Sequence, residues 1–348
     1  MALVPEHGRS QGSTKVPVPA IPWAPRQYQC PRAHGVTVDG LLGETAWQRA
    51  AWTEDFVDIE GELKPQPRLR TRAKMLWDDS YFYVGAELAE PHLWATLRQR
   101  DTVIFHDNDF EVFIDPDGDT HLYYELEVNA LGTVWDLLLV KPYRDGGPAV
   151  NAWDIRGLRV GVALFGTLNE PADIDSAWTV EMALPWEVLG ECAAHKGPPL
   201  RHECWRVNFS RVEWRTQVVG GRYVKVRDPH SGRPLPEDNW VWSPQGVVNM
   251  HYPEMWGLVH FVEEQGSSIV PMPPHEGTKW LLRQLYYAQW RHYVEHGAFA
   301  QELGSLPAYT APPQGVRLFT GPHTFWATCP SSDGALWWIA SDGRVWKE

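Results

Sequence analysis

The sequence lacks the short motifs that mark several familiar catalytic centres. It has no G-x-S-x-G nucleophile elbow, no glycine-rich phosphate loop, no H-E-x-x-H zinc motif and no dinucleotide-binding fingerprint. Its four cysteines, Cys30, Cys192, Cys204 and Cys329, form no C-x-x-C pair, which argues against zinc ribbons and thioredoxin-type sites. Cys192 and Cys204 are close enough in sequence to form a disulfide in an oxidising compartment, and free thiols are an equal alternative.

Long apolar runs and an excess of positive charge are absent as well. No apolar run reaches the roughly 18 residues that a membrane span needs, and the N-terminal segment has no apolar core of a signal peptide. The chain has 348 residues and a formal net charge of -13. An acidic surface repels phosphate groups, so we expect no nucleic acid partner, and the lack of a long apolar run predicts no membrane span.

Tryptophan is abundant, with 20 residues in the chain. A buried indole needs a partner for its N–H group, so such a chain builds either an aromatic core or aromatic platforms for a ligand. The flat C–H faces of sugar rings suit such platforms. For any single tryptophan the core position is the commoner of the two.

Short alternating segments separated by turn residues occupy the middle of the chain. They follow an N-terminal stretch, residues 1–33, that is rich in Pro, Gly and small polar residues and is typical of an extended tail. Strands joined by short turns, with no long helix between them, predict a mainly β fold, an antiparallel β-sandwich over residues 34–263. The predicted strands are 70–79, 81–90, 109–115, 121–132, 133–141, 158–168, 177–186, 205–214, 223–228, 239–244 and 256–262.

The last part of the chain has a different pattern. Pro and Gly residues predict a linker over 264–276. Residues 277–296 carry apolar side chains at helical spacing, and Gly297 follows as a stop signal. L-W-W-I-A and R-V-W-K flank the turn Ser341-Asp342-Gly343, a hairpin signal. Residues 277–348 are therefore predicted to form a helix plus a small antiparallel sheet, a C-terminal α+β extension.

Several motifs of the strand-rich region occur in an order typical of one family. They are V-D-G-L-L-G-E-T-A-W, M-L-W-D-D-S-Y-F-Y-V, D-N-D-F-E-V-F-I-D, W-T-V-E-M-A-L-P-W, and W-S-P followed by P-E-M-W-G-L-V. Together they resemble the family 9 carbohydrate-binding modules over about residues 34–263. The resemblance implies a DOMON-like β-sandwich that binds a plant- or microbe-type saccharide and carries structural calcium.

The resemblance also implies positions for the sugar-binding residues. The family's glutamate falls on Glu111, and the first of its two stacking tryptophans falls on Phe105. The other expected groups are replaced: the arginine by Glu127, the amide by Ser210, and the second tryptophan by Met250 or His251. The change from arginine to Glu127 reverses the charge at the site, so the fold is implied more strongly than the ligand.

Four carboxylates, Asp109, Glu111, Glu125 and Glu127, alternate along two neighbouring predicted strands and so share one sheet face. Such a patch can accept hydrogen bonds from vicinal sugar hydroxyls. It can also supply the acid and base, or the nucleophile, of a glycoside hydrolase, in which case carboxyl groups about 5–5.5 Å or 6.5–9.5 Å apart across an open groove are expected. The third alternative is a solvated face with Arg206 or Arg211 as partners.

Asp115, Asp117 and Asp119 lie two residues apart in the loop P-D-G-D. Hard oxygen ligands at this spacing suit calcium, which accepts irregular geometry. A plain hairpin turn with solvated acids is the alternative.

Further candidates for ligand binding lie towards the end of the sandwich. Arg211, Glu213 and Trp214 combine charge with an aromatic ring, while Trp240 and Trp242 share one face of a strand and form either a stacking platform or part of the core. Weaker candidates beside turns or strand ends are Trp94, Trp135 and Trp153. The spacing of His92, His106, His121 and His251 matches no metal motif, so the histidines form a metal site only if the fold brings them together.

The sequence thus predicts a non-catalytic protein that binds an oligo- or polysaccharide through aromatic platforms, carboxylates and amides. The alternative is a carbohydrate-active hydrolase that uses two of the four carboxylates. A haem-binding DOMON relative is a third class, which would need an axial Met/His pair. Polysaccharides are captured outside the cytoplasm, so we expect a secreted, periplasmic or cell-surface location.

Overall fold

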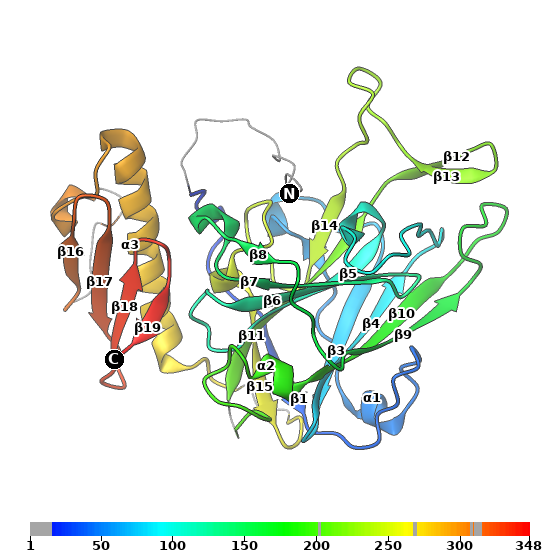
Figure 1. The fold of residues 1–348 in the computed structure, drawn as a ribbon, viewed down its shortest axis with the longest axis horizontal. Coiled ribbons are helices and arrows are strands. Elements are labelled where there is room, and N and C mark those ends of the chain that lie inside the picture. Colours follow the sequence, from blue (N-terminus) through cyan, green and yellow to red (C-terminus); the bar gives the residue numbers. More distant parts are fainter. Residues whose placement is uncertain (1–15, 201–202, 267–269, 307–308, 310–314) are drawn as a thin grey trace. The chain divides into compact units, whose positions relative to one another are not determined.

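The computed structural model describes residues 16–200, 203–266, 270–306, 309 and 315–348. The chain forms two compact units, one of residues 20–271 and one of residues 272–348 together with the described residues 16–19 (Figure 1). The division after residue 271 falls inside the predicted linker 264–276. The N-terminal unit extends further towards the N-terminus than predicted.

The N-terminal unit contains a nine-stranded sheet with the strand order β1-β15-β11-β5-β6-β7-β8, to which β14 and β2 are added beside β11 (Figure 1). Its strands are β1 (Gln27–Pro31), β2 (Val57–Asp58), β5 (Asp109–Asp115), β6 (Tyr123–Asn129), β7 (Val134–Leu139), β8 (Ala149–Val150), β11 (Cys204–Glu213), β14 (Asp238–Val241) and β15 (Gly257–Val262). The predicted hairpin of β5 and β6 is confirmed.

A four-stranded antiparallel sheet, β3-β4-β10-β9, forms the second layer. Its strands are β3 (Thr71–Trp77), β4 (Tyr81–Ala89), β9 (Arg159–Phe165) and β10 (Ala177–Pro185). β3 pairs with β4 and β9 pairs with β10, as expected of predicted strands that neighbour each other in the sequence. The mainly β, sandwich architecture is therefore as the turn spacing predicted.

The core of the sandwich lies between these two sheets. Phe110, Val112 and Ile114 of β5 join Val84 and Leu88 of β4 in one buried cluster. We call the side of the large sheet that carries Phe110 the inner face. The opposite side, which carries Asp109, Glu111 and Phe113, is the outer face, because successive side chains of a strand alternate.

The N-terminal tail prediction needs one correction. Residues 27–31 form β1, which runs parallel to β15 at the edge of the large sheet. Tyr28 and Cys30 of β1 are buried in the core. The stretch was predicted as a tail because its Pro and Gly content resembles a loop, but the backbone pairing with a strand more than 200 residues away prevails.

Two of the motifs behind the family resemblance meet in a single contact. Glu181 of W-T-V-E-M accepts hydrogen bonds from the main-chain N–H groups of Asp39 (2.9 Å) and Gly40 (2.7 Å) and from the indole of Trp47 (2.5 Å). Gly40 has φ +92°, and a Cβ there would lie 2.5 Å from the main chain of Val162. These motif residues are therefore required by the fold.

Most of the buried tryptophans serve the core rather than a ligand. Six of them are among the largest fully buried side chains: Trp47, Trp178, Trp186, Trp205, Trp242 and Trp256. Indole N–H groups find acceptors, for example Trp186 at the carbonyl of Asp78 and Trp242 at the carboxylate of Glu54. The four cysteines are free thiols, so Cys192 and Cys204 do not form a disulfide.

Shorter elements complete the N-terminal unit. They are helices α1 (Thr45–Arg49) and α2 (Trp186–Leu189), the two-stranded ribbon β12 (Thr216–Val219) and β13 (Arg222–Lys225), and the 3-10 turns η1 (Gly61–Leu63), η2 (Ile104–His106), η3 (Tyr143–Asp145) and η4 (Pro253–Met255). The turns η2 and η3 carry the aromatic residues Phe105 and Tyr143.

The C-terminal unit contains the predicted helix and small sheet. Helix α3 (Pro274–His296) begins slightly before the predicted start and ends at Gly297, whose φ is +73°. Its sheet has the order β16-β17-β18-β19, with η5 (Leu303–Ser305) preceding it, and the predicted hairpin joins β18 to β19. The strands are β16 (Arg317–Thr320), β17 (Phe325–Pro330), β18 (Leu336–Ala340) and β19 (Val345–Lys347). Among the described residues, no helix is both long and apolar enough to cross a membrane.

Candidate ligand-binding face

Four carboxylates gather on the outer face of the large sheet, as the alternation predicted. We call Asp109, Glu111, Glu125 and Glu127 the acid cluster. Glu111 of β5 lies directly opposite Glu127 of β6. One carboxylate oxygen each from Asp109, Glu111 and Glu127 lies within 4.8 Å of the others.

The acid cluster is buried, which excludes the solvated face considered from the sequence. Asp109 is 0% exposed and Glu127 is 1% exposed. Asp109 Oδ2, Glu111 Oε2 and Glu125 Oε2 are buried without a hydrogen-bond partner. Across the described parts of the chain, no Lys, Arg or His nitrogen lies within ion-pair distance of these four carboxylates.

Burial has a large effect on the ionisation of the acid cluster. It raises the pKa of Glu111 to about 7, because a carboxylate loses hydration there. Burial also raises the pKa of Asp109, Glu125 and Glu127 well above the usual range, and repulsion from Glu111 adds to the effect. The cluster therefore holds protons unless a positive charge is supplied.

The two arginines that the sequence offered as partners are engaged elsewhere. Arg206 donates to the main-chain carbonyls of Glu254 (2.9 Å) and Trp256 (3.1 Å). Arg211 lies on the inner face, where it forms ion pairs with Glu90 (2.7 Å) and Glu213 (2.8 Å). Neither guanidinium neutralises the acid cluster.

Aromatic side chains border the acid cluster. The main-chain N–H of Phe105, in η2, donates to Glu127 Oε2 at 2.9 Å. The half-buried ring of Phe105 lies 6.4 Å from that of Trp135, which is the cross-strand neighbour of Glu127. Tyr143 of η3 is 38% exposed. Partial burial raises the pKa of its hydroxyl, and the charges of the nearby Glu125 and Glu127 raise it further. No pattern in the sequence pointed to Tyr143, since it lies in a turn.

The remaining positions implied by the resemblance also lie on the outer face. Ser210 of β11 is the cross-strand neighbour of Glu111. Met250 belongs to the apolar cluster of this face, and His251 contacts it by hydrogen bonding the hydroxyl of Tyr123 at 2.9 Å. Burial lowers the pKa of His251 to about 3, so this histidine is neutral near pH 7.

Four sequence-predicted ligand residues do not belong to this face. Trp240 and Trp242 are buried in the sandwich core and cannot stack on a sugar, so their assignment as a platform is corrected. Arg211 and Glu213 pair with each other on the inner face, and both are almost fully buried. The reason is the phase of β11, in which Arg211 lies opposite Phe110 rather than opposite Glu111. Trp214 follows β11 and donates its indole N–H to the carbonyl of Phe105 at 2.8 Å, which places it beside the outer face.

The predicted calcium loop also brings its carboxylates together. Oxygens of Asp115, Asp117 and Asp119 lie within 4.8 Å of one another, and two of these side chains are buried. Asp115 accepts hydrogen bonds from the N–H groups of Gly118 (3.0 Å) and Thr120 (2.9 Å), which curl the loop around it. The oxygen donors present fit a hard cation such as calcium.

The other candidates are less suited to a metal. Asp101, Asp136 and Asp154 also converge, but Arg100 forms ion pairs with all three. Within the described residues, none of the groups that could hold a metal includes a histidine, so the structure does not join His92, His106, His121 and His251 into one site. His92, for example, contacts the hydroxyl of Tyr223 at 3.1 Å.

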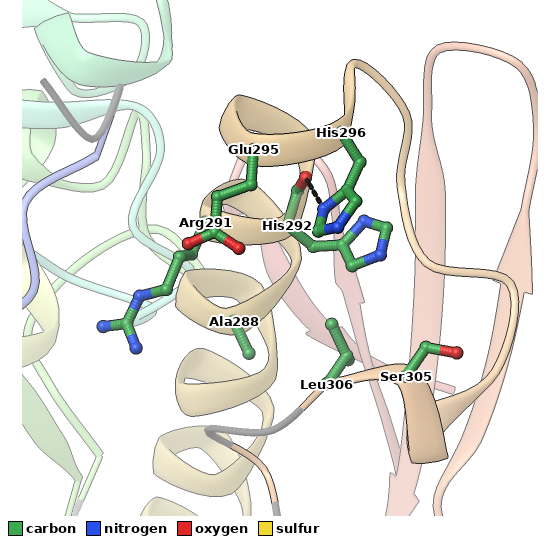
Figure 2. A pocket seen from close by; sticks show the side chains of 7 residues that line it. All are labelled: Ala288, Arg291, His292, Glu295, His296, Ser305 and Leu306. Atoms are coloured by element: carbon green, nitrogen blue, oxygen red, sulfur yellow. Dashed lines mark hydrogen bonds between the residues drawn. The ribbon is translucent and has the colours of Figure 1, made fainter.

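A separate hollow of about 520 Å³ lies in the C-terminal unit (Figure 2). Its lining includes His292 and His296, which stack with their ring centres 4.2 Å apart. The Nδ1 atoms of these two rings contact the carbonyls of Ala298 and His292. Among the described residues no third His, Cys, Asp or Glu lies close enough to complete a metal site there, so we assign no function to this hollow.

Comparison with known proteins supports the family resemblance. The sequence profile of the carbohydrate family 9 binding domain-like family matches residues 38–197, which include β5, β6 and β7. No curated protein matches the chain.

Solved structures also resemble the chain. A protein from Bacteroides uniformis that is thought to bind carbohydrate is 14% identical, with a TM-score of 0.49 over 68% of this chain and 100% of its own. A family 9 module from Caldicellulosiruptor kristjanssonii, solved with cellotriose, is 15% identical, with a TM-score of 0.44 over 72% of this chain and 100% of its own. The same module solved with glucose gives 15% identity and a TM-score of 0.45, over 71% of this chain and 100% of its own. Residues 38–197 of this chain are therefore similar to the carbohydrate family 9 binding domain-like family.

Proposed function

We propose that this protein binds a saccharide, without turning it over, on the outer face of its large sheet. The observation that carries the proposal is the match of residues 38–197 to a carbohydrate-binding family. We also propose that the protein acts outside the cytoplasm, where polysaccharides are encountered.

The geometry of the outer face supports a sugar site at the aromatic border of the acid cluster. Phe105 and Trp135 present half-buried rings close to Glu127, and Tyr143 adds an exposed ring. Aromatic faces pack against the C–H groups of a sugar ring, while carboxylate oxygens accept hydrogen bonds from its hydroxyls.

A structural calcium ion in the loop of Asp115, Asp117 and Asp119 forms part of the same proposal. The loop joins β5 to β6, so an ion there would fix the turn between the two strands that carry the acid cluster. The convergence of its carboxylate oxygens supports this assignment.

A glycoside hydrolase remains the second candidate, because paired carboxylates are present. Hydrolases place the two groups across an open groove at about 5–5.5 Å or 6.5–9.5 Å. Here the oxygens of Asp109, Glu111 and Glu127 lie within 4.8 Å of one another and are buried. This arrangement favours binding over hydrolysis.

The test is a panel of oligo- and polysaccharides applied to the whole chain. Binding is measured as a thermal shift, and hydrolysis is measured as reducing-end release in the same wells. We expect a shift without release. Release that disappears in Glu111→Gln or Glu127→Gln would replace the binding proposal with the hydrolase.

The matched variants are Trp135→Ala and Phe165→Ala. Trp135 borders the acid cluster, whereas Phe165 is an exposed aromatic residue of β9 in the other sheet. Loss of a stacking ring should weaken saccharide binding about tenfold or more, since stacking contributes on the order of 1–2 kcal/mol. If Trp135→Ala and Phe165→Ala bind the saccharide with equal affinity, the binding site does not lie on the outer face.

A further inference from the structure

We propose that the acid cluster binds a hard divalent cation of the calcium class. This site is distinct from the loop of Asp115, Asp117 and Asp119. It also does not depend on the saccharide proposal, because it follows from the carboxylates alone.

The spacing of the carboxylates fits one ion. Calcium–oxygen distances are about 2.3–2.6 Å, so two ligand oxygens on opposite sides of the ion lie up to about 5 Å apart. Oxygens of Asp109, Glu111 and Glu127 lie within 4.8 Å of one another. All three can therefore coordinate one ion without a shift of the strands.

The unpartnered oxygens of the acid cluster point to a ligand. Buried polar atoms in folded proteins nearly always have partners. Two oxygens of the converging carboxylates are buried without a hydrogen-bond partner, Asp109 Oδ2 and Glu111 Oε2. The same is true of Glu125 Oε2, which belongs to the acid cluster but not to the three converging groups. Glu125 is 6% exposed and close enough to Glu111 for the charge of Glu111 to raise its pKa. Its carboxylate adds negative charge close to the proposed ion.

Neighbouring elements do not provide the missing positive charge. Lys225 of β13 is close enough to Asp109 to feel its charge, but its Nζ lies 3.2 Å from the ring centre of Trp214 and forms no ion pair with the acid cluster. His106 of η2 interacts with Lys225, Glu237 and Asp107. The Asp107 carboxylate accepts hydrogen bonds from Thr96, Leu97 and Asn129.

The group around Arg100 shows what a satisfied cluster looks like in this protein. Asp101, Asp136 and Asp154 converge as closely as the acid cluster does, and one guanidinium pairs with all of them. The acid cluster has the same density of carboxylates, is more buried, and has no such partner among the described residues. A divalent ion fits this place because hard oxygen donors are the ligands that it prefers.

The experiment uses the whole chain with Asp117→Asn, which weakens the loop site. Cations are removed with a chelator, the chelator is removed by dialysis, and CaCl₂, MgCl₂ or MnCl₂ is titrated at pH 7.5 by calorimetry and thermal shift. We expect Asp117→Asn to retain one saturable calcium site. Adding Glu127→Gln should weaken that site at least tenfold, while adding Asp154→Asn should leave it unchanged.

Several results would overturn the proposal. They are the absence of a saturable site in Asp117→Asn, and a site whose affinity is the same with Glu127→Gln. If Glu127→Gln fails to fold, Glu111→Gln in the Asp117→Asn background decides. It removes another of the converging oxygen ligands, so calcium affinity should fall at least tenfold, and an unchanged affinity would contradict the proposal.

The ion and saccharide proposals fail separately. Calcium binding without a thermal shift on any saccharide would support the ion site and reject the sugar site. A thermal shift on a saccharide that is identical with and without chelator, together with no calcium site in Asp117→Asn, would support the sugar site and reject the ion site.

Discussion

Carboxylates are buried on both faces of the large sheet, and the presence of a cationic partner distinguishes Glu213 on the inner face from the acid cluster on the outer face. On the inner face, Glu213 shares the guanidinium of Arg211 with Glu90, which follows β4 of the other sheet, and the nitrogen–oxygen distances are 2.8 Å to Glu213 and 2.7 Å to Glu90. On the outer face, the acid cluster has more carboxylates and no ion-pair partner among the described residues. The inner group is thus a completed structural network, whereas the outer group has the chemistry of a binding site.

The difference matters because buried charge is costly unless it is compensated. Burial raises the pKa of Glu90 to about 8, with repulsion from Glu213 as the next cause, so one proton and one guanidinium neutralise the inner pair near pH 7. The acid cluster can be neutralised only by protons or by a ligand. Proteins retain such uncompensated clusters mainly where they serve a function.

The largest expected effect comes from breaking the inner network. Arg211→Met should destabilise the protein by about 3–5 kcal/mol, because it leaves two buried carboxylates without their shared cation. Urea denaturation followed by tryptophan fluorescence measures the change in the free energy of unfolding. Unchanged stability would mean that Arg68, which also pairs with Glu213, suffices by itself.

The next effect concerns the pH dependence of the chelated protein. The pKa of Glu111 rises from 4.5 to about 7 on folding, so the folded state holds a proton that the unfolded state releases. The associated stability is fully present below pH 4.5 and is lost as the pH rises to about 7, by up to about 3 kcal/mol.

Comparison with Glu111→Gln isolates this contribution. Glu181, whose pKa burial also raises to about 7, titrates in the same window in both proteins. The wild type should lose more stability than Glu111→Gln between pH 4.5 and 7. Saturating calcium should flatten the wild-type profile. Parallel profiles of the two chelated proteins would show that Glu111 does not hold the proton.

Glu181 is a buried carboxylate whose negative charge is stabilised by hydrogen bonds instead of by a cation, so it offers a further test. Glu181 accepts three N–H groups, from Asp39, Gly40 and Trp47. Glu181→Gln would turn an amide N–H₂ group towards at least one of these donors and should cost about 1–3 kcal/mol. Thermal and urea denaturation measure this cost. A fully stable variant would show that the contact between the two motifs is dispensable.

The smallest effect is expected in the group around Arg100. Asp154 has a side chain 61% exposed, and Arg100 retains two other carboxylates without it. Asp154→Asn should change the free energy of unfolding by less than about 0.5 kcal/mol, because exposed ion pairs contribute little. A larger loss in urea denaturation would mean that this group is also a structural network.

The sequence predicted the local hairpins well. The turn residues between β3 and β4 and between β5 and β6 lie within a few residues of the strands that they join, so local chemistry sufficed. It also predicted that Asp109, Glu111, Glu125 and Glu127 share a face, since alternation along a strand is a local property. It did not predict β1, because its partner β15 is distant in sequence.

The assignment of residues to the two faces was harder. Ser210 and Arg211 are neighbours in sequence, yet they point to opposite sides of β11. A shift of one residue in register exchanges the two faces of a strand, and the register of β11 against β5 is set by contacts across about 100 residues of chain. Arg211, Glu213, Trp240 and Trp242 were therefore predicted as ligand residues and lie on the core side.

The sequence by itself determined the family motifs, the strand order along the chain, and the shared face of the acid cluster, because each follows from turn chemistry and two-residue alternation. Only the tertiary structure decided that this face is buried, that Arg211 turns away from it, and that Phe105, Trp135 and Tyr143 border it. Burial and pairing depend on which distant strands and turns meet, and no local pattern encodes that meeting.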